Sequence, residues 1–536
     1  MRALLPSLVL GLAIALAGSS AAAPGPPRLL ALRITNGDTP FAGDTPQLTT
    51  VSPNGDGFRD RAVIRFSLDQ PASVQVQAVA TGGAGEDDVP IWRTRRSFGT
   101  GPHSITWAPR RSAPDRTYLL RFIVHGRQGG RRVYGYEAPR PGHRTSGLVV
   151  RVQSVEAGFL LRSYPVGAAA TVSIATDARS VRLQVFSLAS VLHPTTRDLR
   201  TRGSALAPPV TLDWRRHRDA PSLVKVGTAG DWETGLYLLR VTTGDGRVGV
   251  APLILRPRTL GAHRVAVVFP TNTWQAYNRL DQDGDGWGNS WYVNDAIRSV
   301  DLRRPYLDFG VASTYHDWSL DVVSWLQRTG KEVDYLSDDD LGRARSADAL
   351  RRAYTMIVFP AHEEYVTQRQ LALLRGYRDL GGRLMFLSAN NLLWKVTRSG
   401  QFERRVQMWR KLGRAEAGLV GAQWAGSGTR RTQAPFVVQG AVAAPWAFAG
   451  TGLANGAAFG RFGIEVDART RSSPPGTIVL ARIARLVGGK DAEMTYYETP
   501  TGARVFSAGA VNFASAIGVP AVSRLLENVW ARLSGP

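Results

Sequence analysis

The chain has 536 residues, 43% of them hydrophobic, and a formal net charge of +23. It contains no cysteine, which excludes disulfides, a lipoprotein anchor, thiolate metal sites and a cysteine nucleophile. The positive charge is almost all arginine and is spread without a basic block, so we interpret it as a solvated surface and expect no nucleic-acid partner. Attraction to anionic polymers of the cell envelope is the alternative.

The first 23 residues have the pattern of a secretory signal peptide. Arg2 precedes an apolar stretch from Leu4 to Ala17, and small residues follow up to Ala23. This stretch is shorter than a membrane-spanning helix, which needs about 20 residues, and no later segment resembles such a helix. We therefore expect residues 1–23 to be removed and the protein to be secreted, soluble and not membrane-spanning.

Residues 24–44 are rich in proline and glycine and lack periodicity, which predicts a linker or an extended arm. Residues 45–146 contain short stretches of alternating hydrophobicity, such as Arg61 to Leu68 and Tyr118 to Val124. Such strands between turns predict a β-sandwich. A second β-rich block, which we also interpret as a β-sandwich, covers residues 147–258, with strands around Ala170, Val181 and Gly235.

The turn Pro53-Asn54-Gly55-Asp56-Gly57 and the strands after it resemble the immunoglobulin-like domain named after the flagellar hook-capping protein, over about residues 45–130. That resemblance implies a secreted or surface β-sandwich that accompanies other domains. Oxygens of Asn54, Asp56 and Asp60 could hold Ca²⁺, or the side chains could stabilise the turn without a metal.

Strands alternate with amphipathic helices in residues 259–536, which predicts an α/β domain with a parallel, doubly wound sheet. Three predicted strands are followed by polar segments: Val265 to Phe269 by Tyr277, Met356 to Phe359 by His362 and Glu364, and Leu384 to Leu387 by Asn390. Ligands of open α/β sheets bind at the carboxyl ends of their strands. We therefore expect one crevice lined by these side chains.

Several motifs of this region resemble the large (beta) subunit of N,N-dimethylformamidase, over about residues 150–536. They are Thr271 to Asn278, Asp334 to Leu341, His362 to Tyr365 and Gly381 to Trp394. The resemblance implies a sheet domain like the class I glutamine amidotransferases, a mononuclear iron held by two tyrosines and a glutamate, and hydrolysis of an amide C–N bond.

By their positions in these motifs, Tyr277 and Glu364 match iron ligands of the family, while His362 and Asn390 match polar residues beside the metal. A second tyrosine ligand is expected where this chain has Trp318, and Tyr315, one turn earlier, is the substitute. Alternatively, Tyr277 packs under the strand end and His362 only lines the crevice.

The roles of the catalytic candidates follow from their chemistry. His362 would be a general acid or base, Asn390 a donor to the developing oxyanion, and Glu498 a candidate second base.

The segment Asp281-Gln-Asp283-Gly-Asp285-Gly-Trp287-Gly-Asn289 resembles the first half of a calcium loop, with carboxylates at alternate positions and glycines at turns. Asp281, Asp283, Asp285 and Asn289 are therefore calcium-ligand candidates, and a metal-free acidic turn is the alternative. A bound Ca²⁺ would stiffen the loop that follows Tyr277.

Three functions remain open from the sequence: a metal-dependent amide hydrolase acting on a small substrate, a non-catalytic binding or adhesion module, and a hydrolase of a cell-envelope polymer. The sequence favours the first, with iron and calcium as candidate cofactors. It also leaves a homo-oligomer open.

Overall fold

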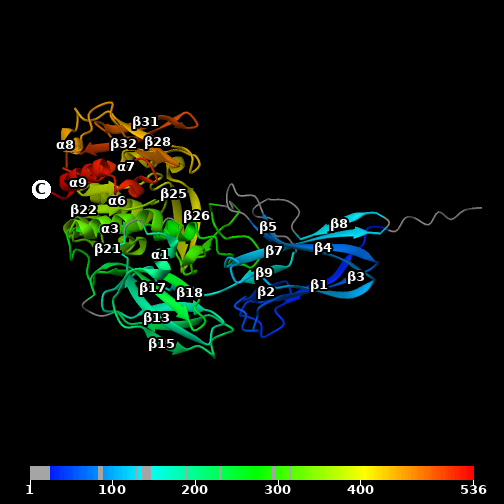
Figure 1. The fold of residues 1–536 in the computed structure, drawn as a ribbon. Coiled ribbons are helices and arrows are strands. Elements are labelled where there is room, and N and C mark those ends of the chain that lie inside the picture. The colour runs from blue at the N-terminus through cyan, green and yellow to red at the C-terminus, as the bar shows by residue number, and fades with distance from the viewer. Residues whose placement is uncertain are drawn as a thin grey trace, which may run out of the picture.

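The fold is described from a computed structural model, which covers residues 25–535 except 82–88, 128, 136–146, 189, 192–193, 229–231, 293–295 and 314. The predicted signal peptide lies outside these residues. A β-sandwich at the amino-terminal end stands beside a larger body that contains a second sandwich and a mixed sheet with helices (Figure 1). The predicted multidomain architecture, rich in β-sheets, is confirmed.

The first sandwich packs a three-stranded sheet, β1-β3-β6, against a sheet in the order β2-β9-β7-β4-β5, with β8 paired to β7. Burial alternates along β4 because one face of the strand lies in the shared core: Val74 and Val76 are buried, and Gln75 between them is half-exposed. The strands are β1 Leu29–Thr35, β2 Leu48–Val51, β3 Ala62–Leu68, β4 Ala72–Ala80, β5 Val89–Phe98, β6 Gly101–Trp107, β7 Arg116–Gly126, β8 Arg131–Tyr134 and β9 Val149–Val152.

Two segments at the edges of this sandwich differ from the prediction. Residues 29–35, predicted as linker, form β1, which pairs antiparallel with β3 and buries Leu29 and Ile34. Residues 149–152, predicted as the start of the second sandwich, form β9, which pairs with β2 and β7. Local composition misses both strands because their partners are distant in sequence.

The second sandwich also consists of two sheets, β10-β12-β16 and β11-β18-β17-β13-β14, with β15 paired to β13. Its core includes Trp214, Leu239 and Leu253. Its elements are β10 Glu156–Phe159, β11 Tyr164–Pro165, β12 Ala170–Ala175, β13 Ser180–Ser187, α1 Thr196–Thr201, β14 Ser204–Ala205, β15 Val210–Asp213, β16 Ser222–Val226, β17 Gly235–Thr243 and β18 Val248–Arg256.

A nine-stranded sheet in the order β21-β19-β22-β24-β33-β32-β31-β28-β29 forms the centre of the carboxyl-terminal part. The first five strands pair in parallel, and the other four join them antiparallel. These strands are β19 Val265–Phe269, β21 Asp334–Ser337, β22 Met356–Phe359, β24 Arg383–Phe386, β28 Gln433–Val438, β29 Ala458–Gly463, β31 Ile478–Val487, β32 Lys490–Glu498 and β33 Arg504–Ser507.

Helices cover both faces of the parallel strands. In β19, Val265 and Val267 belong to a core shared with α3 and α9, whereas Ala266 and Val268 belong to one shared with α5 and α6. Burial on both faces explains why the strand reads as a continuous apolar run. The helices are α2 Thr271–Ala276, α3 Leu320–Arg328, α4 Asp338–Arg343, α5 Ala347–Ala353, α6 Gln368–Asp379, α7 Ala417–Val420, α8 Pro445–Phe448 and α9 Pro520–Ser534.

Smaller elements complete this part of the chain. A four-stranded sheet, β20-β26-β25-β23, and a two-stranded sheet, β27-β30, lie outside the central sheet. The elements are β20 Val300–Asp301, β23 Tyr365–Thr367, β25 Trp394–Ser399, β26 Phe402–Met408, β27 Gln423–Ser427, β30 Glu465–Ala468, the π-helix Tyr315–Ser319, and 3₁₀-helices Asp308–Gly310, Trp409–Leu412 and Phe513–Ala516. The predicted likeness to class I glutamine amidotransferases stays a prediction.

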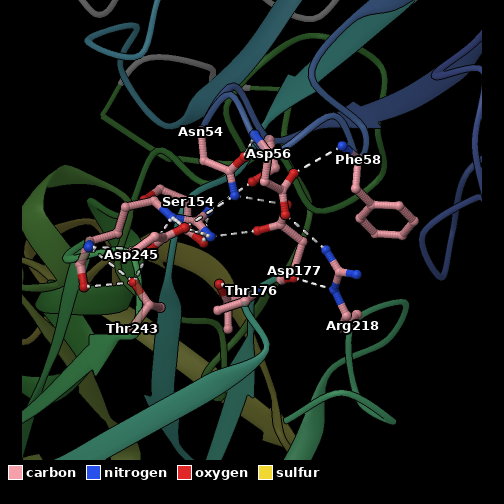
Figure 2. Close-up of polar contacts among 12 residues, drawn as sticks. Asn54, Asp56, Phe58, Ser154, Thr176, Asp177, Arg218, Thr243 and Asp245 are labelled. Atoms are coloured by element: carbon pink, nitrogen blue, oxygen red, sulfur yellow. Dashed lines mark hydrogen bonds and ion pairs between the residues drawn. The ribbon is translucent and has the colours of Figure 1, made fainter.

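The distinctive turn of the first sandwich contacts the second sandwich (Figure 2). Asn54 donates to Asp245 at 3.1 Å, and Arg218 forms an ion pair with Asp56 at 3.1 Å. Within the turn, both Asp60 oxygens accept backbone N–H groups, from Gly55 and Gly57, at 2.7 Å. Hydrogen bonds to these side chains therefore stabilise the turn, as in an Asx turn, and attach it to its neighbour.

The acidic loop after Tyr277 makes a second contact with the first sandwich. Trp287 is 5% exposed and packs in a small cluster with Leu48, Val79, Leu119 and Val149. The loop that leaves the α/β sheet is thus held by the amino-terminal sandwich. No helix among the described residues is long and apolar enough to cross a membrane.

Candidate functional site

The three predicted polar segments meet at one edge of the central sheet. Strand β22 lies between β19 and β24, and all three run in parallel, so their carboxyl ends are adjacent. Tyr277 follows β19 through the short helix α2, Glu364 follows β22, and Asn390 follows β24. The sheet topology therefore brings together side chains from segments far apart in the sequence.

Direct contacts join these side chains. The Tyr277 hydroxyl donates to Glu364 Oε2 at 2.5 Å, and the rings of Tyr277 and His362 lie 5.6 Å apart. His362 Nε2 lies 3.6 Å from Glu364 Oε2. His362 and Glu364 are buried, whereas Tyr277 is half-buried beside Tyr292, which is 47% exposed. The cluster thus reaches solvent on its tyrosine side.

Two carboxylates that the sequence analysis did not identify complete the cluster. Glu465 Oε2 lies 3.6 Å from His362 Nε2 and accepts the side-chain N–H of Asn390 at 2.8 Å. Asp467 accepts the backbone N–H of Asn390 at 2.7 Å. The only local signal is that the two acids alternate in a short extended segment and so share one face.

Long-range pairing fixes the position of Glu465. Its strand β30 pairs with β27 and also follows the segment that leaves β33: Val511 N–H donates to Glu465 O, and Asp467 N–H donates to Gly509 O. Residues 509–511 come directly after the carboxyl end of β33. Glu465 therefore arrives at the same sheet edge from a separate part of the chain.

The surroundings of Glu364 favour its protonated form. Burial, followed by the negative charge of Glu465, raises the pKa of Glu364 to about 8, although hydrogen bonds from Tyr277 and Asn390 act in the opposite direction. Burial, followed by the charge of Glu364, raises the pKa of Tyr277 well above its usual value. Burial also raises the pKa of Asp467 to about 7. Acidic groups are thus crowded into a buried volume that disfavours their charged forms.

His362 is held neutral with a lone pair directed at acceptors. Burial lowers its pKa below the usual 6.5, partly offset by Glu465 and by a hydrogen bond to the Asn390 backbone. Because Nε2 has no hydrogen-bond partner among the described residues, that bond belongs to Nδ1, which therefore carries the proton. The unprotonated Nε2 then faces the oxygens of Glu364 and Glu465, an arrangement that a cation would stabilise.

The backbone around the cluster adopts the left-handed conformation at three non-glycine positions. Asn390, Leu392 and Ile464 have positive φ angles of 54°, 60° and 68°. Such values are rare outside glycine and especially unfavourable for β-branched Ile464, the residue before Glu465. Strain of this kind is typical of functional sites.

Two sequence candidates do not join the cluster. Tyr315 is fully buried, its ring packs 5.6 Å from that of Trp274, and its hydroxyl has no hydrogen-bond partner among the described residues. Glu498 pairs with Arg504 at the start of β33, so it lies at the amino edge of the parallel strands, where Arg532 binds it at 2.7 Å. The structure therefore supplies Glu465, rather than Glu498, as the second carboxylate beside His362.

The calcium-ligand candidates lie close together. One carboxylate oxygen from each of Asp281, Asp283 and Asp285 falls within 4.8 Å of the others. Asp281 also accepts the N–H groups of Gly284 and Gly286 at 2.7 and 2.8 Å, and burial and then Asp285 raise its pKa to about 7. The side-chain oxygen of Asn289 accepts the Gln282 N–H. Calcium here stays a prediction.

Comparisons with known proteins agree with the sequence motifs. The beta subunit of N,N-dimethylformamidase from Paracoccus aminophilus is 23% identical over 202 residues, which cover 31% of this chain and 26% of that protein. The beta subunit from an Alcaligenes species is 35% identical over 77 residues, covering 14% and 10%. The chain thus matches about a quarter or less of the length of these relatives.

Solved structures are similar only at a low level. Trypsin-activated alpha-2-macroglobulin from Escherichia coli matches with a TM-score of 0.23 and 11% identity, over 43% of this chain and 17% of that one. A score this low carries no argument about the fold. By contrast, residues 210–524, more than half of the chain, match a family model described as "N,N-dimethylformamidase beta subunit-like, C-terminal". The matched region contains every residue of the cluster. The chain belongs to the N,N-dimethylformamidase beta subunit-like family.

Proposed function

We propose that this protein is a metal-dependent hydrolase of a non-peptide amide C–N bond, with its site at Tyr277, His362, Glu364, Asn390 and Glu465. The observation that carries the proposal is the convergence of unprotonated His362 Nε2 on two carboxylates, each at 3.6 Å, in a buried volume at the carboxyl edge of the sheet. Family membership supports the reaction class, because the matched relatives are named N,N-dimethylformamidase.

The donor atoms present suit a hard metal ion such as iron. Tyr277 and Glu364 provide oxygens in mutual contact, and His362 Nε2 and Glu465 lie next to them. The Tyr315 hydroxyl has no hydrogen bond to any of these groups. We infer that Tyr277 and Glu364 hold the metal and that His362 Nε2 replaces the second tyrosine. A metal bound there would polarise the amide carbonyl.

The protein groups provide the proton transfers. Glu465 accepts a proton from the attacking water and returns it to the nitrogen that leaves as the C–N bond breaks. The Asn390 side chain, which donates to Glu465 at 2.8 Å, orients that carboxylate, and it is also the candidate donor to the developing oxyanion. The hydrogen bond to the Asn390 backbone orients the neutral ring of His362 and leaves Nε2 available to bind the metal.

Elemental analysis together with an amide-hydrolysis assay tests this function. We expect near-stoichiometric iron in the purified protein, lost in both Tyr277→Phe and Glu364→Gln, and hydrolysis of small formamides that is lost with it. Tyr315→Phe removes a buried hydroxyl outside the cluster and is the matched control, with iron retained. Protein that folds, binds no metal and hydrolyses no amide would contradict the proposal and favour the binding-module alternative.

We also propose that the protein is secreted, on the basis of the predicted signal peptide. The apolar stretch from Leu4 to Ala17 and the small residues after it support this proposal. Fractionation of cells that express the full chain, with residues 2–23 deleted as the comparison, tests this expectation. Equal amounts of both forms inside the cell would contradict it.

A further inference from the structure

A cleft lined by arginines lies on the α/β part of the protein, apart from the proposed amide site. It has a volume of about 370 Å³ and is formed by α6, the 3₁₀-helix Trp409–Leu412 with the turn after it, and the turn at Arg471. Arg375, Arg410, Arg414 and Arg471 line it, together with small residues such as Gly413 and Gly418. None of these residues belongs to the His362 cluster.

The cleft contains more positive charge than its own carboxylate can balance. Glu416 is 1% exposed and is bound by Arg410 Nε at 3.1 and 3.2 Å. Arg414 and Arg471 are exposed, and neither side chain has a hydrogen-bond or ion-pair partner among the described residues. Two buried guanidinium nitrogens, Arg375 Nε and Arg410 Nη2, also lack a partner there.

The electrostatics of Arg375 reflect this imbalance. Burial, followed by the neighbouring charges of Arg378 and Arg414, lowers its pKa. Its Nη2 donates to Ala415 O at 3.2 Å, which holds the guanidinium against the wall of the cleft that it lines. An anion in the cleft would relieve the repulsion between these like charges.

We propose that this cleft binds a phosphate oxyanion, either free or carried on a polymer. Guanidinium groups match the oxygens of phosphate with paired N–H donors, and buried donors without partners gain most from such an anion. The volume falls within the range of about 300–1,000 Å³ typical of ligand sites. The net charge of +23 would attract anions to the surface as a whole, and the cleft supplies the place where they are held.

Calorimetric titration of the full mature chain with inorganic phosphate, at constant ionic strength, tests the proposal. The double variant Arg414→Ala/Arg471→Ala removes the two unpartnered side chains at the rim. It should bind phosphate at least about tenfold more weakly, because the loss of even one charged hydrogen bond, worth about 1.5 kcal/mol, weakens binding by about that factor. Arg431→Ala/Lys490→Ala removes the same charge from an exposed turn and from the exposed first residue of β32, and should change the affinity by less than about twofold.

The outcomes separate specific binding from general attraction. Equal weakening in both double variants, or no measurable binding by the wild-type protein, would overturn the proposal. A parallel titration with long-chain polyphosphate identifies the source of the phosphate. If the cleft takes phosphate carried on a polymer, the Arg414→Ala/Arg471→Ala variant loses about tenfold in affinity for both ligands. If it takes a free anion, the loss appears with inorganic phosphate alone. Thermal unfolding of the variants without phosphate checks that all are folded.

Discussion

Replacing Glu465 by glutamine should make Glu364 ionise at a lower pH in the metal-free protein. Burial is the largest cause of the raised pKa of Glu364, which is about 8, and the charge of Glu465 is the second. An oxygen of each carboxylate lies 3.6 Å from His362 Nε2, so the two oxygens are close neighbours. The glutamine side chain would remove the charge but keep an oxygen that accepts the Asn390 N–H.

The size of the shift follows from Coulomb's law. Two charges about 7 Å apart, the greatest separation that these contacts allow, interact by about 2 kcal/mol at an effective dielectric constant of about 20, equivalent to between one and two pH units. We therefore expect Glu465→Gln to lower the pKa of Glu364 by roughly that amount, with burial keeping it above the ordinary value.

Infrared difference spectroscopy over a pH series measures this titration through the band of the protonated carboxyl group. The band that disappears in Glu364→Gln assigns the signal to Glu364. Glu498→Gln removes a carboxylate from the opposite sheet edge and should leave the midpoint unchanged. A Glu465→Gln protein with the wild-type midpoint would refute the electrostatic coupling and weaken the case for a shared cation.

Three further predictions concern stability and metal content. Folded Glu364 keeps its proton up to a pH of about 8, whereas the unfolded group loses it near 4.5. The unfolded state therefore binds fewer protons between these pH values, and the free energy of unfolding of the metal-free protein should fall as pH rises. Urea unfolding of Glu364→Gln should show a smaller fall, and identical slopes for both proteins would contradict this prediction. Trp287→Ala should destabilise the contact between the acidic loop and the first sandwich by about 3–5 kcal/mol, seen as a lower unfolding midpoint, because it leaves a cavity among four buried side chains; an unchanged midpoint would show that the contact contributes nothing. If the acidic loop holds calcium, removal of calcium by a chelator should lower the midpoint of thermal unfolding of the wild type but not of Asp285→Asn. Calorimetry together with elemental analysis measures this difference. Equal responses of the two proteins would rule out this site.

Much of the candidate site could be predicted because its residues follow apolar strands within short segments. Glu364 comes shortly after Phe359, the last residue of β22, and Asn390 comes shortly after Phe386, the last of β24. In a parallel sheet such positions fall at one edge whatever the details of packing. The order of strands and turns in the sequence was therefore enough to group Tyr277, Glu364 and Asn390.

Other contacts could not be read from local patterns. Glu498 and Glu465 both belong to acidic, strand-forming segments, and only the pairing of β32 with β33 and of β30 with β27 sends them to opposite edges of the sheet. Tyr315 lies near the expected ligand in sequence, but it packs against Trp274. The linker prediction for residues 24–44 likewise missed β1, whose partner β3 lies further along the chain, beyond β2.

Hydrophobic periodicity and short motifs are local properties, so they were enough to predict the β-rich multidomain architecture, the family and four of the groups that meet at the sheet edge. The folded chain was needed to show that Glu465 faces His362, that Trp287 enters the amino-terminal sandwich, and that four arginines from separate segments share one cleft. Each of these depends on the register and packing of segments far apart in the chain, where the free energy of burial and pairing, rather than local preference, selects the contact.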